Sequence, residues 1–343
     1  NWSAYSAAGH PFFKTAGVAD AFIFSLFTQS AGFELGTQIY TCLLYVTAGA
    51  GMYALVCHLG GARTGAVVAA AAYVFSWFMT FTVYYQTYLN NFLTYAIMPW
   101  AALFFIKAIA EQSRRYLFAA AGMLFLSVTS NAQVSIKLIL FVVPLAFVET
   151  VICRSLSWRR WFAYSAVLGA MALSWAVFLI VPALELRKEV FLLGGLRSVQ
   201  FIKPWEVLVS IPLYAINMLY VQLGGRSFLA AESLSRAIYT DYIGLSVAIV
   251  VFVGVFAYWR RGDRRLQWTV WLLVFYWALY FLAVPNLGAS VWIGITHNWA
   301  ILPTLVLAIL CRYGCEWLQE RWSQRWAVAL LCALVVADLG GAS

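Results

Sequence analysis

Gln133 and Lys137 are unusual polar residues, because they open a long apolar stretch. They are four residues apart in the segment 133–153, which places them on one face of a helix. Lys137 would lie more than one turn inside this segment, where an ionisable group tends to face a bundle interior or a wet cavity. Two interpretations stay open. Lys137 could bind the phosphate of a lipid-linked substrate, with Gln133 and Asn131 contacting that substrate, or its long side chain could reach the lipid headgroups.

A second charged group, Glu185, Arg187 and Lys188, directly follows another apolar segment. The two cations are candidate ligands for a phosphate group, and their positive charge would keep Glu185 ionised at neutral pH. An ionised carboxylate at the mouth of a cavity could act as a general base or bind a divalent cation. It could equally form an ion pair with its neighbours. The need for a metal cofactor therefore stays open.

The remaining candidates are single residues in polar stretches. His10 and His297 could contact the donor phosphate, although a single histidine is more often structural. Asp20 is a candidate catalytic acid, although an acid in an interfacial helix usually lies on its wet face. Asn90 and Asn91 follow a run of tyrosines, which indicates either sugar contacts or the aromatic belt of a membrane protein.

Composition indicates an integral membrane protein. Of the 343 residues, 64% are hydrophobic and only 10% are charged, whereas soluble domains carry about 25% charged residues. The net charge of +9 does not indicate nucleic-acid binding, because the basic residues lie in short clusters between apolar runs. Six scattered cysteines are interpreted as buried thiols in helices. Motifs for nucleotide hydrolysis and zinc proteolysis are absent from the sequence.

The apolar pattern predicts an all-α membrane protein with about ten transmembrane helices, each near the ~20 residues that cross a bilayer. Residues 1–37 form a polar outer loop with an interfacial helix at about 19–27, and residues 38–182 hold six spans. Residues 183–240 form a long outer loop with interfacial or re-entrant helices, and residues 241–343 hold four spans. The spans are placed at about 38–58, 64–85, 92–110, 116–131, 133–153, 161–182, 241–259, 266–285, 298–313 and 326–341.

The distribution of lysine and arginine predicts the orientation. Most of the 22 basic residues lie on one side of the predicted spans, and the positive side of a membrane protein is cytoplasmic. Residues 1–37 and 183–240 therefore face outward. The basic residues assigned to the cytoplasmic side are Arg63, Lys107, Arg114, Arg115, Arg154, Arg159, Arg160, Arg260, Arg261, Arg264, Arg265, Arg312, Arg321 and Arg325.

Several short motifs resemble one family. Residues 2–13 (WSAYSAAGHPFF) look like an outer loop of the GT-C superfamily of integral-membrane glycosyltransferases, and more closely that of the bacterial YfhO-like multi-pass membrane proteins. Further similar motifs are 49–53 (GAGMY), 58–60 (HLG), 98–100 (MPW), 131–133 (NAQ), 182–186 (PALEL) and 242–245 (YIGL).

The resemblance implies transfer of a sugar from a polyprenyl-phosphate donor to a glycan, lipid or protein acceptor on the outer face of the cell membrane. It also implies a catalytic acid in the first outer loop, in a segment expected to precede Asn1. His297 stands where relatives often carry arginine. Two other functions remain open: a transporter or flippase of lipid-linked sugars, and a non-catalytic membrane assembly subunit.

The orientation yields a first testable prediction. A cysteine introduced by Gly262→Cys should react with a membrane-impermeant thiol reagent only after cells are opened, because Gly262 lies among cytoplasmic arginines. Ser198→Cys, in the long outer loop, is the matched variant and should react in intact cells. Labelling of Gly262→Cys from outside intact cells would contradict the orientation.

Overall fold

The computed structural model describes residues 2–3, 10–11, 18–76, 79, 89–130, 132–190, 245–279, 301–321, 333–334 and 337. Within these ranges, the side chains of 2–3, 10–11, 18, 89–91, 132–134, 175–176, 178–190 and 245 lie outside the description. The elements are β1 (Trp2–Ser3), β2 (His10–Pro11), α2 (Val18–Ala31), α3 (Phe33–His58), α4 (Arg63–Val74), α6 (Leu89–Glu111), α7 (Arg114–Ser130), α8 (Ala132–Phe147), the π-helix η1 (Val148–Cys153), α9 (Trp158–Val190), α12 (Leu245–Trp259), α13 (Arg264–Ala278) and α15 (Ile301–Arg321). Apart from the short antiparallel pair β1–β2, these elements are helices, as the sequence predicts.

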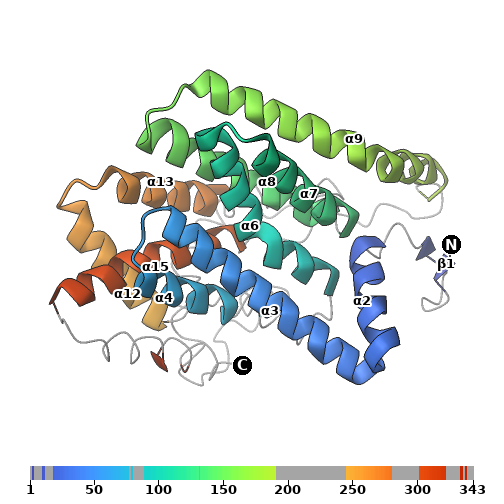
Figure 1. Cartoon of the computed structure of the whole chain (residues 1–343), viewed down its shortest axis with the longest axis horizontal. Coiled ribbons are helices and arrows are strands. Elements are labelled where there is room, and N and C mark those ends of the chain that lie inside the picture. Colours follow the sequence, from blue (N-terminus) through green and yellow to red (C-terminus); the bar gives the residue numbers. More distant parts are fainter. Residues whose placement is uncertain are drawn as a thin grey trace, which may run out of the picture.

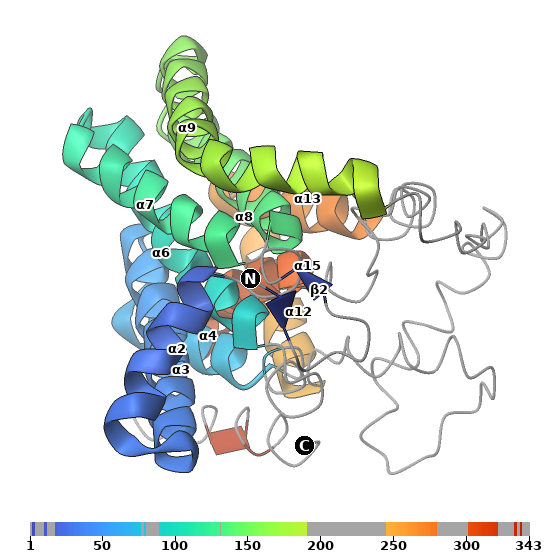
Figure 2. The same cartoon turned by 90° about the vertical axis from the view of Figure 1, so that its right-hand side faces the viewer.

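Two helices form the centre of the bundle. α6 packs against α3, α7 and α8, and α15 packs against α4, α12 and α13. Every residue of α15 from Ile301 to Cys315 is buried, and α6 is buried over most of its length. Figures 1 and 2 show both helices surrounded by the others, and α3 with α4 connects the two groups. Helices that are apolar all round, such as these two, belong in the core of a bundle.

Four helices in the described part of the chain are long and apolar enough to cross a membrane. They cover Phe33–His58, Phe92–Glu111, Ser135–Cys153 and Ile301–Arg321. Large apolar side chains also point outward from the bundle: Val46 is 67% exposed and Phe252 is 71% exposed. A soluble protein would bury such surface, so lipid is its natural solvent. The structure thus supports a membrane protein, and the predicted number of about ten spans remains a prediction.

The predicted segment 64–85 forms a shorter helix than expected. α4 ends at Val74, where the Ser76 side chain donates a hydrogen bond to the carbonyl of Tyr73 at 2.7 Å. Such local side-chain bonds compete with continued helix. The apolar composition of this segment predicted a helix but could not predict that the helix ends at Val74. Residues 80–88 lie outside the description.

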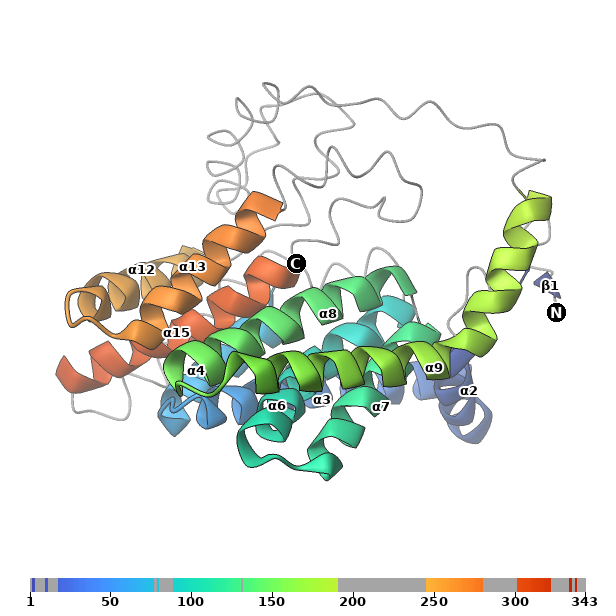
Figure 3. The ribbon, with the colours of Figure 1, turned by 90° about the horizontal axis from the view of Figure 1, so that it is seen from above.

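Two other helices extend beyond their predicted ends. α9 continues past residue 182 to Val190, and Figure 3 shows that it bends toward its carboxyl end. Pro182 lies in this part of α9, where it removes one backbone donor. α15 continues past residue 313 to Arg321. Hydropathy detects where a helix is apolar, not where it ends, and charged residues with good helix propensity continue both helices.

Prolines inside two helices are compensated by tyrosines from neighbouring helices. Pro99 in α6 has no N–H, so the carbonyl of Tyr95 loses its helical partner, and the Tyr73 hydroxyl of α4 donates to it at 2.6 Å. Pro144 in α8 likewise leaves the carbonyl of Leu140 without its helical donor. This carbonyl accepts a hydrogen bond from the hydroxyl of Tyr276 in α13 at 2.7 Å. Hydroxyl groups of neighbouring helices thus satisfy the carbonyls that both prolines leave without a helical donor.

Glycines allow the closest helix contacts. A side chain at Gly51 in α3 would meet the ring of Trp100 at 2.6 Å, and that ring donates from Nε1 to the carbonyl of Thr47 at 2.9 Å. Where α12 crosses α15, a Cβ on Gly254 would come within 2.3 Å of the backbone of Gly314. Small residues at such crossings let backbones approach closely, which favours association inside a membrane.

The tyrosine–proline pairing yields a second prediction. Tyr73→Phe should destabilise the protein by about 1–3 kcal/mol, because the carbonyl of Tyr95 is then buried without a donor. In the Pro99→Ala background an alanine N–H can restore the helical bond, so the same Tyr73→Phe change should cost clearly less. Thermal unfolding in detergent of the two single variants and the double variant measures this coupling. Equal costs in both backgrounds would contradict it.

Candidate functional site

A buried carboxylate organises one end of the bundle. Glu149 in η1 is only 1% exposed, and its Oε1 accepts from Arg154 Nε and from Arg265 NH2, each at 2.9 Å. Arg154 NH2 also lies 3.3 Å from Nε2 of His58, the last residue of α3. The carboxylate therefore connects the end of α3, the π-helix and the first turn of α13.

A backbone carbonyl at the carboxyl end of α3 belongs to the same network. The carbonyl of Leu59 accepts from NH1 of Arg265 at 2.5 Å and from NH1 of Arg312 at 2.8 Å. Arg312, in α15, is 3% exposed and also donates to the hydroxyl of Tyr313. Cations at the carboxyl end of a helix satisfy its last carbonyls and its dipole. Arg312 lies near the end of the predicted span 298–313, and the extension of α15 to Arg321 buries it.

Further polar contacts surround this network, which we call the Glu149 end of the bundle (His58, Glu149, Arg154, Arg265 and Arg312). The Glu316 carboxylate accepts from the backbone N–H of Ala62 at 2.9 Å, and Glu320 forms an ion pair with Arg261 at 2.6 Å. Figure 1 shows α4, α12, α13 and part of α15 grouped at this end, opposite α2. The helix ends that the sequence assigns to one side of the membrane thus lie together.

The opposite end holds a second buried acid. Asp20, in the first turn of α2, is 6% exposed, and the hydroxyl of Tyr40 in α3 donates to its Oδ1. Burial raises the pKa of Asp20 to about 6, while the hydrogen bond from Tyr40 acts in the lowering direction. The expectation that this acid lies on a wet helix face is therefore wrong. Glu34, at the start of α3, is exposed instead.

Lys137 is buried at the same end as Asp20. Its side chain, in the second turn of α8, is 3% exposed. Twelve residues separate it from Glu149, which at 1.5 Å per residue corresponds to about 18 Å along the helix. Of the two open interpretations, this burial favours a lysine that faces the bundle interior. We call this region the Asp20 end, defined by Asp20, Tyr40 and Lys137.

Three buried hydroxyl groups lie near Lys137 in the sequence and connect three helices. The Ser127 hydroxyl in α7 donates to Thr94 Oγ1 in α6 at 3.2 Å and lies 2.8 Å from the hydroxyl of Ser135 in α8. These bonds position the first turns of α8, where Gln133 and Lys137 also lie. The sequence predicts the polar start of α8 but not its partners on α6 and α7.

The other predicted site residues are placed only in part. The backbones of Asn90 and Asn91 lie in the first turn of α6, that of Gln133 in the first turn of α8, and that of His10 in β2. The backbones of Glu185, Arg187 and Lys188 lie in the last turns of α9. The side chains of all seven, and all of Asn131 and His297, lie outside the described residues.

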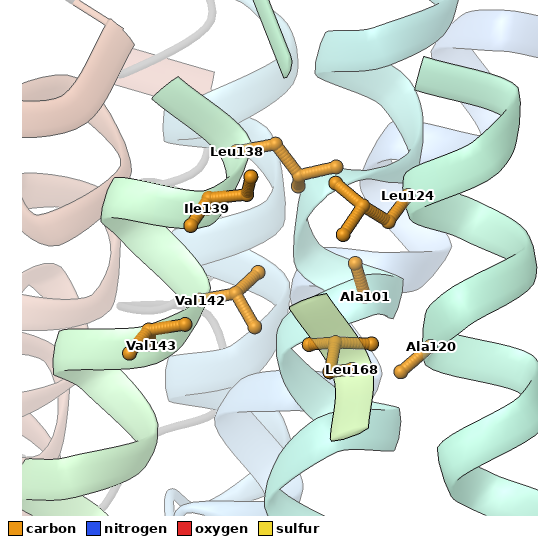
Figure 4. Close-up of a pocket in the computed structure, with 8 residues that line it drawn as sticks. All are labelled: Ala101, Ala120, Leu124, Leu138, Ile139, Val142, Val143 and Leu168. Carbon is orange, nitrogen blue, oxygen red and sulfur yellow. The ribbon is translucent and has the colours of Figure 1, made fainter. Parts of the chain in front are cut away.

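Figure 4 shows an apolar pocket between α6, α7, α8 and α9. Its cavity volume is only about 10 Å³. Its lining carries only aliphatic side chains, from Ala101, Ala120, Leu124, Leu138, Ile139, Val142, Val143 and Leu168. Ile139 is 40% exposed, so the pocket borders the apolar outer surface. It is too small for a substrate, and it offers no polar group for a phosphate or a sugar.

No group of three or more potential metal ligands occurs among the residues that the structure describes. Cys311 and Cys315 are buried in α15, as the sequence predicts, whereas the prediction of a buried thiol is wrong for Cys42, which is exposed, and Cys57 and Cys153 are half-buried. No protein-family model matches the chain, and no curated protein matches its sequence.

Sequence reasoning missed Glu149, although its signal is visible. Glu149 is the one acid in the apolar stretch 133–153, and an ionisable residue inside such a stretch usually has a specific partner. The partners could not be identified from the sequence, because Arg265 is 116 residues away. The π-helix that presents Glu149 has no evident sequence signal either.

Asp20 yields a third prediction, on pH-dependent stability. Its pKa is about 6 in the folded protein against an ordinary value of 3.8, so the folded state binds more protons between these pH values. Stability should therefore fall as pH rises through this window, by on the order of 3 kcal/mol. Asp20→Asn, which cannot ionise but can still accept from Tyr40, should flatten this part of the stability profile.

Thermal unfolding in detergent between pH 4 and pH 7 measures this effect. Glu34→Gln is the matched control, because it removes an exposed acid from the adjacent helix and should keep the wild-type slope. An unchanged slope in Asp20→Asn would show that Asp20 does not titrate in this range.

Proposed function

We propose that this chain is the membrane core of a GT-C-type glycosyltransferase, which moves a sugar from a polyprenyl-phosphate donor to an acceptor. The observation that carries the proposal is the Asp20 end of the bundle. An acid that accepts a hydrogen bond from Tyr40 and a buried lysine lie at this end of the bundle, away from the ionic network around Glu149. Buried ionisable groups inside a membrane protein are costly, and they usually mark a functional site.

The two residues suit two roles in sugar transfer. The acceptor oxygen forms a bond to the anomeric carbon of the donor sugar while the bond from that carbon to the phosphate oxygen breaks. Asp20, whose pKa is about 6, is mostly ionised at neutral pH and can take the proton of the acceptor hydroxyl. Lys137 supplies positive charge that stabilises the departing polyprenyl phosphate.

The orientation and the resemblance support the same proposal. The distribution of basic residues predicts that the Asp20 end faces outward, which is where the resemblance implies that the donor is used. Glu185 in α9 is proposed as a second acid near the acceptor, and Arg187 and Lys188 as further phosphate contacts. His10 and His297 are also proposed as phosphate contacts, and Asn90, Asn91, Asn131 and Gln133 as sugar contacts.

The fourth prediction tests the proposed function directly. The purified full chain in lipid nanodiscs is incubated with polyprenyl-phosphate-linked sugars and candidate acceptors, and release of polyprenyl phosphate is measured. Asp20→Asn should lower kcat by about 10²–10⁴-fold, the usual contribution of a general base, with little change in donor affinity. Lys137→Met should weaken donor binding, because it removes the charge that faces the phosphate.

Two substitutions serve as matched controls. Glu34→Gln removes an exposed acid close to Asp20 in the sequence, and Lys107→Met removes a half-buried lysine far from the Asp20 end. Glu34→Gln should retain wild-type kcat and donor affinity, and Lys107→Met should retain wild-type kcat. Wild-type turnover in Asp20→Asn would rule out its role as the base. Sugar-lipid movement across the membrane without transfer would instead identify a flippase.

A further inference from the structure

The Glu149 end has more positive charge than its carboxylates balance. Glu149 forms ion pairs with two guanidinium groups, those of Arg154 and Arg265. Arg312 is 3% exposed and forms no ion pair among the described residues. The nearby carboxylate of Asp263 accepts from the backbone N–H groups of Arg265 and Leu266, so it caps α13. A buried charge without a counterion is costly.

One further cation, Lys107, increases this excess of positive charge. Arg154, Lys107 and Arg265 all lie close enough to His58 to act on its ring electrostatically. Lys107, at the carboxyl end of α6, is half-buried and lies 5.2 Å from the ring centre of Tyr116. In the described part of the chain Lys107 forms no ion pair.

The arginines also retain unused donors. The Nε atoms of Arg265 and Arg312 are buried and have no hydrogen-bond partner among the residues that the structure describes. The side chains of Arg154 and Arg265 are 32% and 30% exposed, respectively. The cluster is therefore anchored inside by Glu149 and open on its outer side, where an anion can approach the guanidinium groups.

We propose that this cluster binds a phosphate group, carried either by an anionic phospholipid or by a soluble phosphate. Arg154 and Arg265 contribute charge-assisted hydrogen bonds from their exposed faces, and Lys107 contributes a third positive charge. Basic clusters between helices near a membrane surface bind lipid headgroups through the same chemistry. The site lies at the opposite end of the bundle from Asp20, so it is independent of the proposed sugar transfer.

The fifth prediction is tested on the purified, delipidated full chain. Native mass spectrometry measures the binding of phosphatidylglycerol and of phosphatidylcholine, and thermal unfolding in detergent measures stabilisation by inorganic phosphate. Lys107→Gln should weaken binding of the anionic ligand about fivefold, the effect expected for one cation near a membrane surface. Lys107 is preferred to Arg154 for this test, because its removal leaves the Glu149 ion pairs intact.

Arg159→Gln is the matched control. Arg159 is exposed, belongs to the same predicted cytoplasmic side and lies over an aromatic ring at 5.9 Å, so its loss removes the same charge outside the cluster. Selective phosphatidylglycerol binding that falls only in Lys107→Gln identifies a lipid site. Stabilisation by inorganic phosphate with the same dependence identifies a soluble ligand. Equal losses in both variants, or equal binding of the two lipids without phosphate stabilisation, overturns the proposal.

Discussion

The Glu149 carboxylate holds together helices that are far apart in the sequence. It lies 116 residues from Arg265, and both sit where the apolar core gives way to charged residues. Because its Oε1 is shared by two guanidinium groups and is almost inaccessible to solvent, removing it would leave two cations facing each other. A buried, shared ion pair contributes little net stability by itself. Its larger effect here is on the relative positions of η1, the end of α3 and the start of α13.

The two ends of the bundle differ in their electrostatics. At the Glu149 end, arginines pair with acids, cap helix carbonyls and stack on aromatic rings such as that of Tyr313. At the Asp20 end, Asp20 and Lys137 lie on separate helices among apolar and hydroxyl groups. The ion pairs of Glu149 hold helices in place at the Glu149 end, beside cations that form no ion pair among the described residues. Asp20 is instead a buried acid that accepts a hydrogen bond from a tyrosine, and a buried ionisable group of this kind is a candidate for binding or chemistry.

The sequence predicted the class of fold well and the contacts of the candidate site poorly. Apolar runs identified the helices, because burial in lipid or in a bundle requires such runs. They could not locate helix ends, which depend on local bonds such as that of Ser76 or on distant partners such as Arg261 for Glu320. Lys137 was recognised because a lysine in an apolar stretch is conspicuous. The burial of Asp20 was missed because Tyr40, which pairs with it, is an ordinary residue in the next helix.

The two proline carbonyls differ in when their partners are synthesised. Tyr73 precedes Tyr95 in the chain, so the hydroxyl that pairs with the Tyr95 carbonyl is already made when α6 emerges from the ribosome. Tyr276 comes 136 residues after Leu140. The Leu140 carbonyl of α8 therefore has no tyrosine donor until α13 has been translated. The order of synthesis thus allows the α4–α6 pairing to form early, whereas the α8–α13 pairing can form only later.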